Sequence, residues 1–524
     1  MGKYLLKRIL HSILSVIAVV ALVMVLVYSL LNRDLLFKTD GTFVKTAKNQ
    51  RIEYMYAKWE EYGYLDFVPY TDYLSSLLQS GEIDEETRAA AVAIGRTADK
   101  DPELVGEYVE KFTSYYQSQG YEIHRLDAIT ASKYGSKLAA GGEQKLFATK
   151  DIPLIQRLVK YFTGLIEIDN IHKATGDVGE RGLTFTLHDP VYNGRFSPAI
   201  IGNGTYHKYL LYVDGKFPFI HQNMAILRMG TSYTVNNGVD VFDTMSRSQG
   251  AYVLSETTFP TSFVEQSADD LHSATYREGS RTSSPINEAR FTDDYTNVVT
   301  VRSAPSKLGF SFIIGIIATI LAYCIGVPMG VVMARRKDKL LDKIGTVYII
   351  FIIAVPSLAY IFLFKAFGGK LGLPTLFDME SSSRLMYVLP IVSLALPSIA
   401  GTMKWLRRYM IDQMNSDYVK FARSGGLTEN EIFTKHILKN AAIPIVHGIP
   451  GSIIFAMTGA IITERVYVVP GTGNLLTEAI NKYDNGVIVG LTLFYAVLSV
   501  TSIILGDVLM AAVDPRISYT SKAR

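Results

Sequence analysis

Long apolar runs constrain the fold of this chain more than any other feature of its sequence. The first run covers residues 9–31 without a charge and follows Lys3, Lys7 and Arg8. About 20 apolar residues are enough for a helix to cross the hydrocarbon core of a bilayer. The run is longer than the core of a signal peptide, and no small-residue cleavage pattern follows it. It therefore predicts a retained transmembrane helix.

Further apolar runs predict a multi-pass protein. They cover residues 308–334, 344–367, 385–403, 443–462 and 487–513. With 48% hydrophobic and 19% charged residues, the 524-residue chain has the composition of a mixed membrane and soluble protein. The predicted fold class is membrane α-helical, with six transmembrane helices and a large α+β domain inserted between the first two.

Clusters of basic residues give these spans an orientation. The clusters are Lys3, Lys7 and Arg8; Arg335, Arg336, Lys337, Lys339 and Lys343; Lys404, Arg407 and Arg408; Lys420, Arg423, Lys435 and Lys439; and Lys522 with Arg524. When both termini are cytoplasmic, every cluster lies on the cytoplasmic side, as the positive-inside rule requires. Residues 1–31 then hold the N-terminus and first span, 32–306 an extracytoplasmic domain, 307–513 the core, and 514–524 a cytoplasmic C-terminus.

The predicted outer domain is polar and rich in tyrosine. Residues 83–94 and 101–119 have helical patterns, and residues 206–213 and 250–254 resemble strands. At this length the segment can bury a core of its own. The one cysteine of the chain, Cys324, excludes an internal disulfide.

The segment between the fourth and fifth spans, residues 412–442, predicts a sharp helical corner. Residues 417–424 can form a short helix, which Gly425 and Gly426 end because glycine accepts the left-handed conformation of a helix C-terminus. Thr428 and Glu431 have the spacing of a capping box, which begins a second helix.

Apolar residues follow the corner at helical spacing. Leu427 and Ile432 fit a hydrophobic staple, and Phe433, Ile437 and Ala441 recur every four residues. An ordinary solvated loop needs neither two consecutive glycines that end a helix nor such an apolar stripe. The segment therefore predicts a rigid element at the cytoplasmic face, which a partner protein can move.

The corner resembles the EAA loop of ABC importer permeases. The stretch DYVKFARSGGLTENEIFTKHILKNAAIPIV is similar to the version found in the oligopeptide/dipeptide permease family. Ala422 and Gly426 match the last alanine and the glycine of that motif. Lys420 and Phe421 stand where the general motif has its glutamate and first alanine, a departure that favours the peptide branch.

Other stretches resemble the same family in the same order. They are KYLLKRIL at the start, GTSYTVNNGVDVFDTM at 230–245, AVPSLAYIFLF at 354–364, VLPIVSLALPSIAGTMKWLRRYMID at 388–412, ERVYVVPGTGNLLTEAI at 464–480 and DPRI at 514–517. The resemblance covers about the first 35 residues and most of the chain after Met229. Residues 36–150 and 171–229 look like insertions that enlarge the outer domain.

The resemblance implies the type I ABC importer permease fold in a bacterial plasma membrane. It also implies a homologous second permease, two ABC ATPases, an extracellular peptide-binding lipoprotein and a peptide substrate, without nucleic acid. No phosphate-binding loop occurs, so ATP and Mg are expected in the ATPases and no cofactor in this chain. The residues expected to contact an ATPase are Tyr418, Ala422, Arg423, Gly425, Gly426, Leu427, Thr428 and Glu431.

Four residues within or beside the spans are candidates for the gate or the translocation path. Pro356 and Pro397 each remove a backbone hydrogen bond and permit a kink, which can also be static. Glu464 stands at the outer end of the fifth span and Asp507 inside the last. A charge there is often functional, although a structural ion pair with a nearby basic group explains Asp507 equally well. No catalytic or metal-binding spacing is present.

Two other functions remain open from the sequence. A dipeptide or nickel-complex permease would share this architecture. A membrane signalling or mechanotransmission protein could also carry an outer sensor domain after its first span, but it would not need the EAA-like corner. A membrane peptidase lacks a nucleophile or metal constellation, so the main prediction is an oligopeptide permease that is not itself an enzyme.

Overall fold

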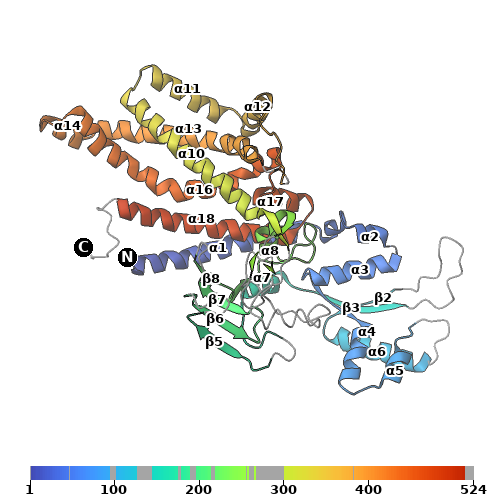
Figure 1. Ribbon diagram of the computed structural model, residues 1–524. Coiled ribbons are helices and arrows are strands. Elements are labelled where there is room, and N and C mark those ends of the chain that lie inside the picture. Colours follow the sequence, from blue (N-terminus) through green and yellow to red (C-terminus); the bar gives the residue numbers. More distant parts are fainter. Residues whose placement is uncertain are drawn as a thin grey trace.

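The apolar runs form a bundle of long helices in the computed structural model of the chain (Figure 1). The structure describes residues 2–46, 48–94, 102–126, 144–174, 179–188, 196–213, 219–254, 257–258, 265–266, 300–379, 381 and 383–513. The predicted C-terminal segment 514–524, with its DPRI sequence, lies outside these residues. Within them, five helices are long and apolar enough to cross a membrane, or up to six if one bent pair is counted as a span.

The bundle consists of helices from both ends of the chain. Its members are α1 (Gly2–Leu30), α10 (Lys307–Arg335), α11 (Leu340–Ala354), α12 (Ser357–Lys370), η4 (Arg384–Tyr387) with α13 (Val388–Met414), α16 (Lys439–Tyr467) and α18 (Asn485–Val513). Small residues bring α10 and α13 close together, as is common between membrane helices. A Cβ on Gly326 would lie 2.9 Å from the Cβ of Thr402.

The third apolar run, expected as one span over 344–367, does not form one straight helix. Its two halves, α11 and α12, meet at an angle of 111°. The break follows from Pro356, which caps α12 and holds the preceding Val355 in an extended conformation (φ −85°, ψ 129°). Residues before proline disfavour the helical region, so the chain turns there.

The fourth and fifth helices extend beyond the predicted spans. The expected range 385–403 ends eleven residues before α13 does, at Met414. The fifth helix begins before Pro444, which lies inside α16 together with Pro450. Charged residues near these ends interrupt the apolar run but not the helix, so an apolar-run criterion underestimates helix length.

Residues 32–306, which the sequence predicts to face outward, are called the outer segment here. Its first part contains short helices around a small antiparallel sheet. Its elements are η1 (Arg33–Phe37), α2 (Gly41–Lys45), α3 (Lys48–Glu61), β1 (Leu65–Pro69), α4 (Tyr70–Gln79), α5 (Glu85–Ala91), α6 (Pro102–Ser118), β2 (Glu122–Leu126) and β3 (Lys145–Asp151). The strand order is β1-β3-β2. The helices predicted over 83–94 and 101–119 are confirmed as α5 and α6, and both pack into an aromatic core around Phe112.

The second part of the outer segment contains most of the strands. Its elements are α7 (Leu154–Gly164), β4 (Ile166–Ile168), β5 (Gly182–Thr186), β6 (Ala199–Asn203), β7 (Tyr209–Val213), β8 (Ile220–Gln222), β9 (Ala225–Leu227), α8 (Val241–Ser246), β10 (Ser248–Leu254), β11 (Thr257–Thr258), β12 (Glu265–Gln266) and β13 (Thr300–Ser306). Strands β5 to β8 form an antiparallel sheet in sequence order, while β4 pairs with β9 and β10 with β13. The strands predicted over 206–213 and 250–254 are confirmed as β7 and β10.

A hydrophobic core joins this outer part to the bundle. Val20 and Met24 of α1 are buried together with Met229, Val241 and Met245 of the segment around α8. Figure 1 shows that α2 to α6 lie beyond one end of the bundle, whereas the start of α1 and the helix α14 lie toward the other. The long helices therefore separate α2 to α6 from the corner.

Candidate functional site

The corner begins with α14 (Asp417–Ser424), whose end is set by the backbone. The N–H of Gly426 donates to the carbonyl of Arg423 at 3.1 Å, and the N–H of Leu427 donates to the carbonyl of Ala422 at 3.3 Å. These two bonds form a Schellman motif, which places one residue in the left-handed region. Gly426 is that residue (φ +84°), so the sequence prediction of a glycine stop is confirmed.

The second helix begins at the predicted capping box. Thr428 caps α15 (Glu429–Glu431); its Oγ1 accepts from the Glu431 N–H at 3.3 Å, and Glu431 Oε2 accepts from the Thr428 N–H at 3.2 Å. The chain then passes through a π-helix, η5 (Ile432–Leu438), into α16. Such wide helical turns are rare and occur often at functional sites. The corner is therefore continuous with a long helix of the bundle.

The two sides of the corner differ in polarity and contact. The predicted stripe Phe433, Ile437 and Ala441 is buried, together with Val419 and Ala422, against α10 and α13. This packing fixes the corner to the bundle. The staple contact between Leu427 and Ile432 stays a prediction.

The solvent side of the corner presents two large apolar side chains, Phe421 and, to a smaller extent, Leu427. Phe421 is 80% exposed, although it lies on the same short helix as the buried Val419 and Ala422. Arg423 crosses the turn and donates to both carboxylate oxygens of Glu429, at 2.5 and 3.0 Å. Sequence reasoning did not count Phe421 among the contact residues, although a phenylalanine in a short charged helix was a readable signal.

The four path candidates lie apart from one another in the fold. Pro356 sits at the break between α11 and α12, and Pro397 lies inside α13. Glu464 lies near the C-terminal end of α16, and Asp507 lies near the C-terminal end of α18. Both residues are buried. The structure does not bring these four residues together into one site.

Glu464 holds together three helices and a loop. Its carboxylate accepts from Ser311 Oγ of α10 at 2.6 Å and from the Asn474 N–H at 2.9 Å, in the first turn of α17 (Thr472–Asn481). Ser311 Oγ also accepts from the Thr472 N–H at 2.9 Å. A Cβ on Gly471 would lie 2.4 Å from the Glu464 carboxyl, so glycine is needed there. A carboxylate at a helix N-terminus is favoured by the helix dipole.

Asp507 forms the ion pair that the sequence left as an alternative. Its Oδ2 lies 2.8 Å from Nη2 of Arg8, which is near the start of α1. The pair joins the first and last helices of the bundle at the end where the N-terminus lies. This contact gives Asp507 a structural role.

Asp484 is a buried carboxylate that sequence reasoning missed. It is fully buried, and its Oδ2 accepts from the backbone N–H groups of Tyr233, Thr234 and Val235 at 2.8 to 2.9 Å. It also accepts from Ser232 Oγ at 2.8 Å. Consecutive N–H groups that converge in this way form an anion-binding nest. The outer segment that resembles the family motif is thus clamped to the start of α18.

Asp342 and Arg407 make a further ion pair, and this one was not predicted from the sequence. The guanidinium of Arg407 donates to both Asp342 oxygens, at 2.6 and 2.7 Å, and Asp342 is buried. The Asp338 N–H donates to the same carboxylate at 2.9 Å. The bidentate pair joins α11 to α13 near the basic loop that follows α10.

Comparison with known proteins finds a family match for part of the chain and a relative that is similar over its whole length. Residues 326–519 match the family described as "Binding-protein-dependent transport system inner membrane component". The chain is 33% identical to an oligopeptide transport system permease protein, AmiC, of Streptococcus pneumoniae over 536 aligned residues, covering 100% of this chain and 99% of AmiC. This chain belongs to the oligopeptide and dipeptide ABC permease family. The resemblance seen in the motifs is thereby confirmed.

The enlarged outer segment of this permease is also found in a relative. The similarity to AmiC extends through residues 36–150 and 171–229, which did not resemble the short family members. In contrast, DppB, a dipeptide transport system permease of Lactococcus lactis, is 33% identical over only 43% of this chain and 73% of its own length. The insertions therefore belong to a longer form of the permease.

Solved structures give a weaker comparison. The inward-facing methionine ABC transporter MetNI covers 39% of this permease and 93% of its own chain, at 15% identity and a TM-score of 0.32. This likeness is too low to carry an argument. The family match and the apolar helices, in contrast, support a multi-pass bacterial membrane protein with an importer permease fold.

Proposed function

We propose that this permease is a membrane subunit of an ATP-driven oligopeptide importer. Full-length similarity to an oligopeptide permease carries this proposal, because the match includes the outer segment as well as the helical core. Oligopeptide import is therefore favoured over dipeptide or nickel-complex import and over signalling without transport.

The proposed topology has six spans, with α11 and α12 together counted as the third. Residues 32–306 face outward, and both termini and the corner face the cytoplasm. The basic clusters support this orientation through the positive-inside rule. A homologous second permease would complete the path, and an extracellular lipoprotein would deliver peptide to the outer side.

The corner from Tyr418 to Glu431 is proposed as the coupling element to one of two partner ATPases. Its exposed Phe421 offers an anchor, and its buried stripe would pass movement on to α10 and α13. Exposed aromatic residues that enter a partner's pocket commonly dominate binding energy. Because the rigid corner continues into α16, a displacement by the ATPase would tilt the bundle rather than bend a loop.

Uptake of a labelled pentapeptide tests both parts of this proposal. Phe421→Ala removes the anchor without touching the buried stripe, and Gly426→Val forces a β-branched residue into the left-handed region. Both should abolish most uptake at unchanged membrane levels of the protein. Gly426→Asn is the matched control, because asparagine tolerates this conformation and nothing lies within 4 Å of the added Cβ.

The outcomes distinguish a wrong cargo from a wrong coupling element. Uptake that is normal in a strain lacking this chain would contradict oligopeptide import. Uptake that depends on the chain but stays normal in Phe421→Ala and Gly426→Val would leave peptide transport intact and contradict coupling through the corner.

A further inference from the structure

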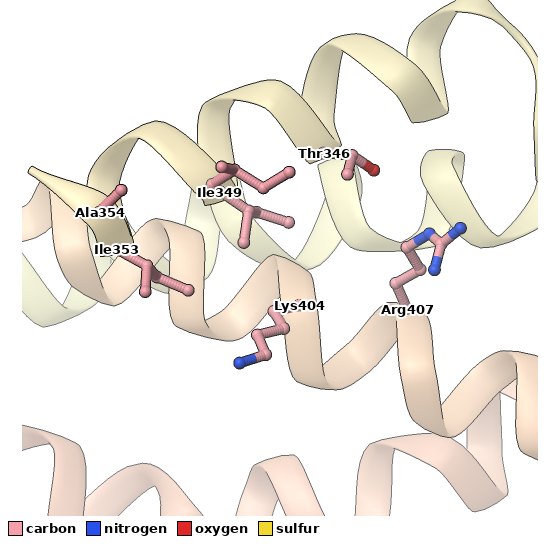
Figure 2. A pocket seen from close by; sticks show the side chains of 7 residues that line it. Thr346, Ile349, Ile353, Ala354, Lys404 and Arg407 are labelled. Atoms are coloured by element: carbon pink, nitrogen blue, oxygen red, sulfur yellow. The ribbon is translucent and has the colours of Figure 1, made fainter.

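A cavity of about 380 Å³ lies between α11 and α13, beside the Asp342–Arg407 ion pair. Four aliphatic residues and one threonine of α11 and two cations of α13 line it: Ile349, Ile350, Ile353, Ala354, Thr346, Lys404 and Arg407. Figure 2 shows α11 above α13, with the Arg407 guanidinium turned toward α11 and the Lys404 side chain, one turn away, extending from α13 on the opposite side in this view. The cavity is thus an apolar groove with positive charge along one side.

The two cations of the groove are not equivalent. Arg407 is held by the buried Asp342 through two hydrogen bonds, so its charge is neutralised within the protein. Lys404 is exposed, and no carboxylate within 4.0 Å pairs with it among the residues that the structure describes. Its Nζ lies 5.7 Å from the centroid of the Trp405 ring. An ammonium without a carboxylate partner therefore stands beside an aromatic ring at this groove.

The neighbours of Lys404 are those found at lipid headgroup depth. Trp405 is 44% exposed and stacks on Tyr409 with ring centroids 5.8 Å apart. The Arg408 guanidinium carbon lies 5.5 Å from the centroid of Trp405. Tryptophan, tyrosine and basic residues gather where a membrane helix leaves the hydrocarbon core. The groove therefore opens next to the interface rather than at the centre of the bilayer.

We propose that this groove binds one anionic phospholipid, with its phosphate on Lys404 Nζ and an acyl chain along α11. Such a lipid needs one cation and an apolar channel, and both are present. A peptide would need backbone donors and acceptors, whereas the α11 side offers four aliphatic side chains and one hydroxyl, Thr346, which already donates to the Asp342 carbonyl. The site goes beyond peptide import. In the proposed topology the lipid would lie in the inner leaflet, and only this choice of leaflet rests on the proposed function.

Tryptophan fluorescence provides a direct test, since the chain has two tryptophans, Trp59 and Trp405. The assembled transporter is reconstituted in phosphatidylcholine bilayers that contain a minor fraction of phospholipid with brominated acyl chains, either phosphatidylglycerol or phosphatidylcholine. Bromine quenches a nearby indole, and a Trp405→Phe variant supplies the background from the buried Trp59 in the outer domain. The difference in quenching reports the lipid next to α13.

Brominated phosphatidylglycerol should bind about five-fold more strongly than brominated phosphatidylcholine, the effect of one lysine at an anionic headgroup. Lys404→Gln should abolish the preference, and Lys404→Arg should retain it. Lys370→Gln removes an exposed lysine from the far end of α12 and should change nothing. If Lys404→Gln fails to fold, Lys404→Met replaces it.

Three results would overturn the proposal. Equal quenching by both lipids in the wild type means that the groove has no anionic preference. Trp405 unquenched by either lipid means that protein, such as a second permease, covers this face. Loss of the preference on addition of millimolar inorganic phosphate means a simple anion site without a lipid.

Discussion

At the residue scale, buried carboxylates connect parts of this permease that are distant in sequence. Asp484 holds the outer segment at Tyr233 to Val235, Glu464 holds the start of α17, and Asp507 pairs with Arg8. A carboxylate that accepts several backbone N–H groups replaces its lost hydration without a counter-ion. The hydrogen bonds and the ion pair of these carboxylates explain how charged residues can be buried in an apolar bundle.

Asp484→Asn should lower the stability of the permease. The amide keeps one acceptor oxygen but loses the charge that holds three backbone N–H groups, at an expected cost of about 2 kcal/mol in unfolding free energy. Chemical denaturation of the purified protein in detergent, followed by circular dichroism, measures this. Asp243→Asn is the control, because Asp243 is exposed in α8 and pairs with an exposed Arg247. Equal effects of both substitutions would contradict the clamp.

Glu464→Ala and Glu464→Gln should separate structure from gating. The alanine variant leaves the Asn474 N–H and the Ser311 hydroxyl without their acceptor, so its thermal midpoint should fall by several degrees. The glutamine variant keeps an acceptor oxygen and should fold and transport nearly as the wild type does. Peptide uptake and thermal unfolding are measured together. A stable glutamine variant without uptake would instead favour a gating charge.

At the element scale, helix ends decide where this chain turns. Gly426 and Thr428 stop one helix and start the next within four residues, whereas Pro356 breaks a span into α11 and α12 at 111°. Both turns follow from backbone chemistry: a left-handed glycine and a capping hydroxyl in one case, and a proline that holds the residue before it extended in the other. The first turn is exposed, and the second joins two helices of the bundle.

Thr428→Ala should loosen the corner without unfolding the bundle. Loss of the cap costs about 1 kcal/mol of local helix stability. Hydrogen exchange should accelerate at residues 429–432 and stay unchanged in α13. Thr428→Ser keeps the hydroxyl and should exchange as the wild type does. Unchanged exchange in the alanine variant would mean that the capping box does not hold the corner.

At the scale of the whole molecule, the first helix and the outer segment form one body with the permease core. Val20 and Met24 of α1 share a core with Met229, Val241 and Met245. At the opposite end, Arg8 fastens α1 to α18 through Asp507. The first helix is therefore tied at both ends, although more than 270 residues separate it from α10.

Exchange of the Arg8 and Asp507 charges tests this attachment. Arg8→Gln should destabilise the protein by about 1–3 kcal/mol, since it removes a charged partner of a buried carboxylate. The double variant Arg8→Asp with Asp507→Arg should recover a large part of that loss. Thermal unfolding of the three proteins measures the coupling. A double variant that is as unstable as the sum of its single changes would show that the pair does not fasten α1.

Much of this architecture was predictable because it depends on local sequence. The glycine stop, the capping box, the buried stripe Phe433–Ile437–Ala441 and helices α5 and α6 were all correctly predicted, since each requires only neighbouring residues. The family was predictable from motifs that remain in order. The family relationship of residues 36–150 and 171–229 was not, because these residues do not resemble the short family members and match a longer relative.

The sequence by itself determined where apolar helices form, where the corner turns and which family the chain belongs to. Hydrophobic length, capping and proline act over a few residues, so they can be read without a fold. Only the tertiary structure decided the partners of Asp484, Glu464 and Asp342, the exposure of Phe421 and the groove beside Lys404. These depend on which distant segments meet, because a buried carboxylate is satisfied by groups that folding brings to it.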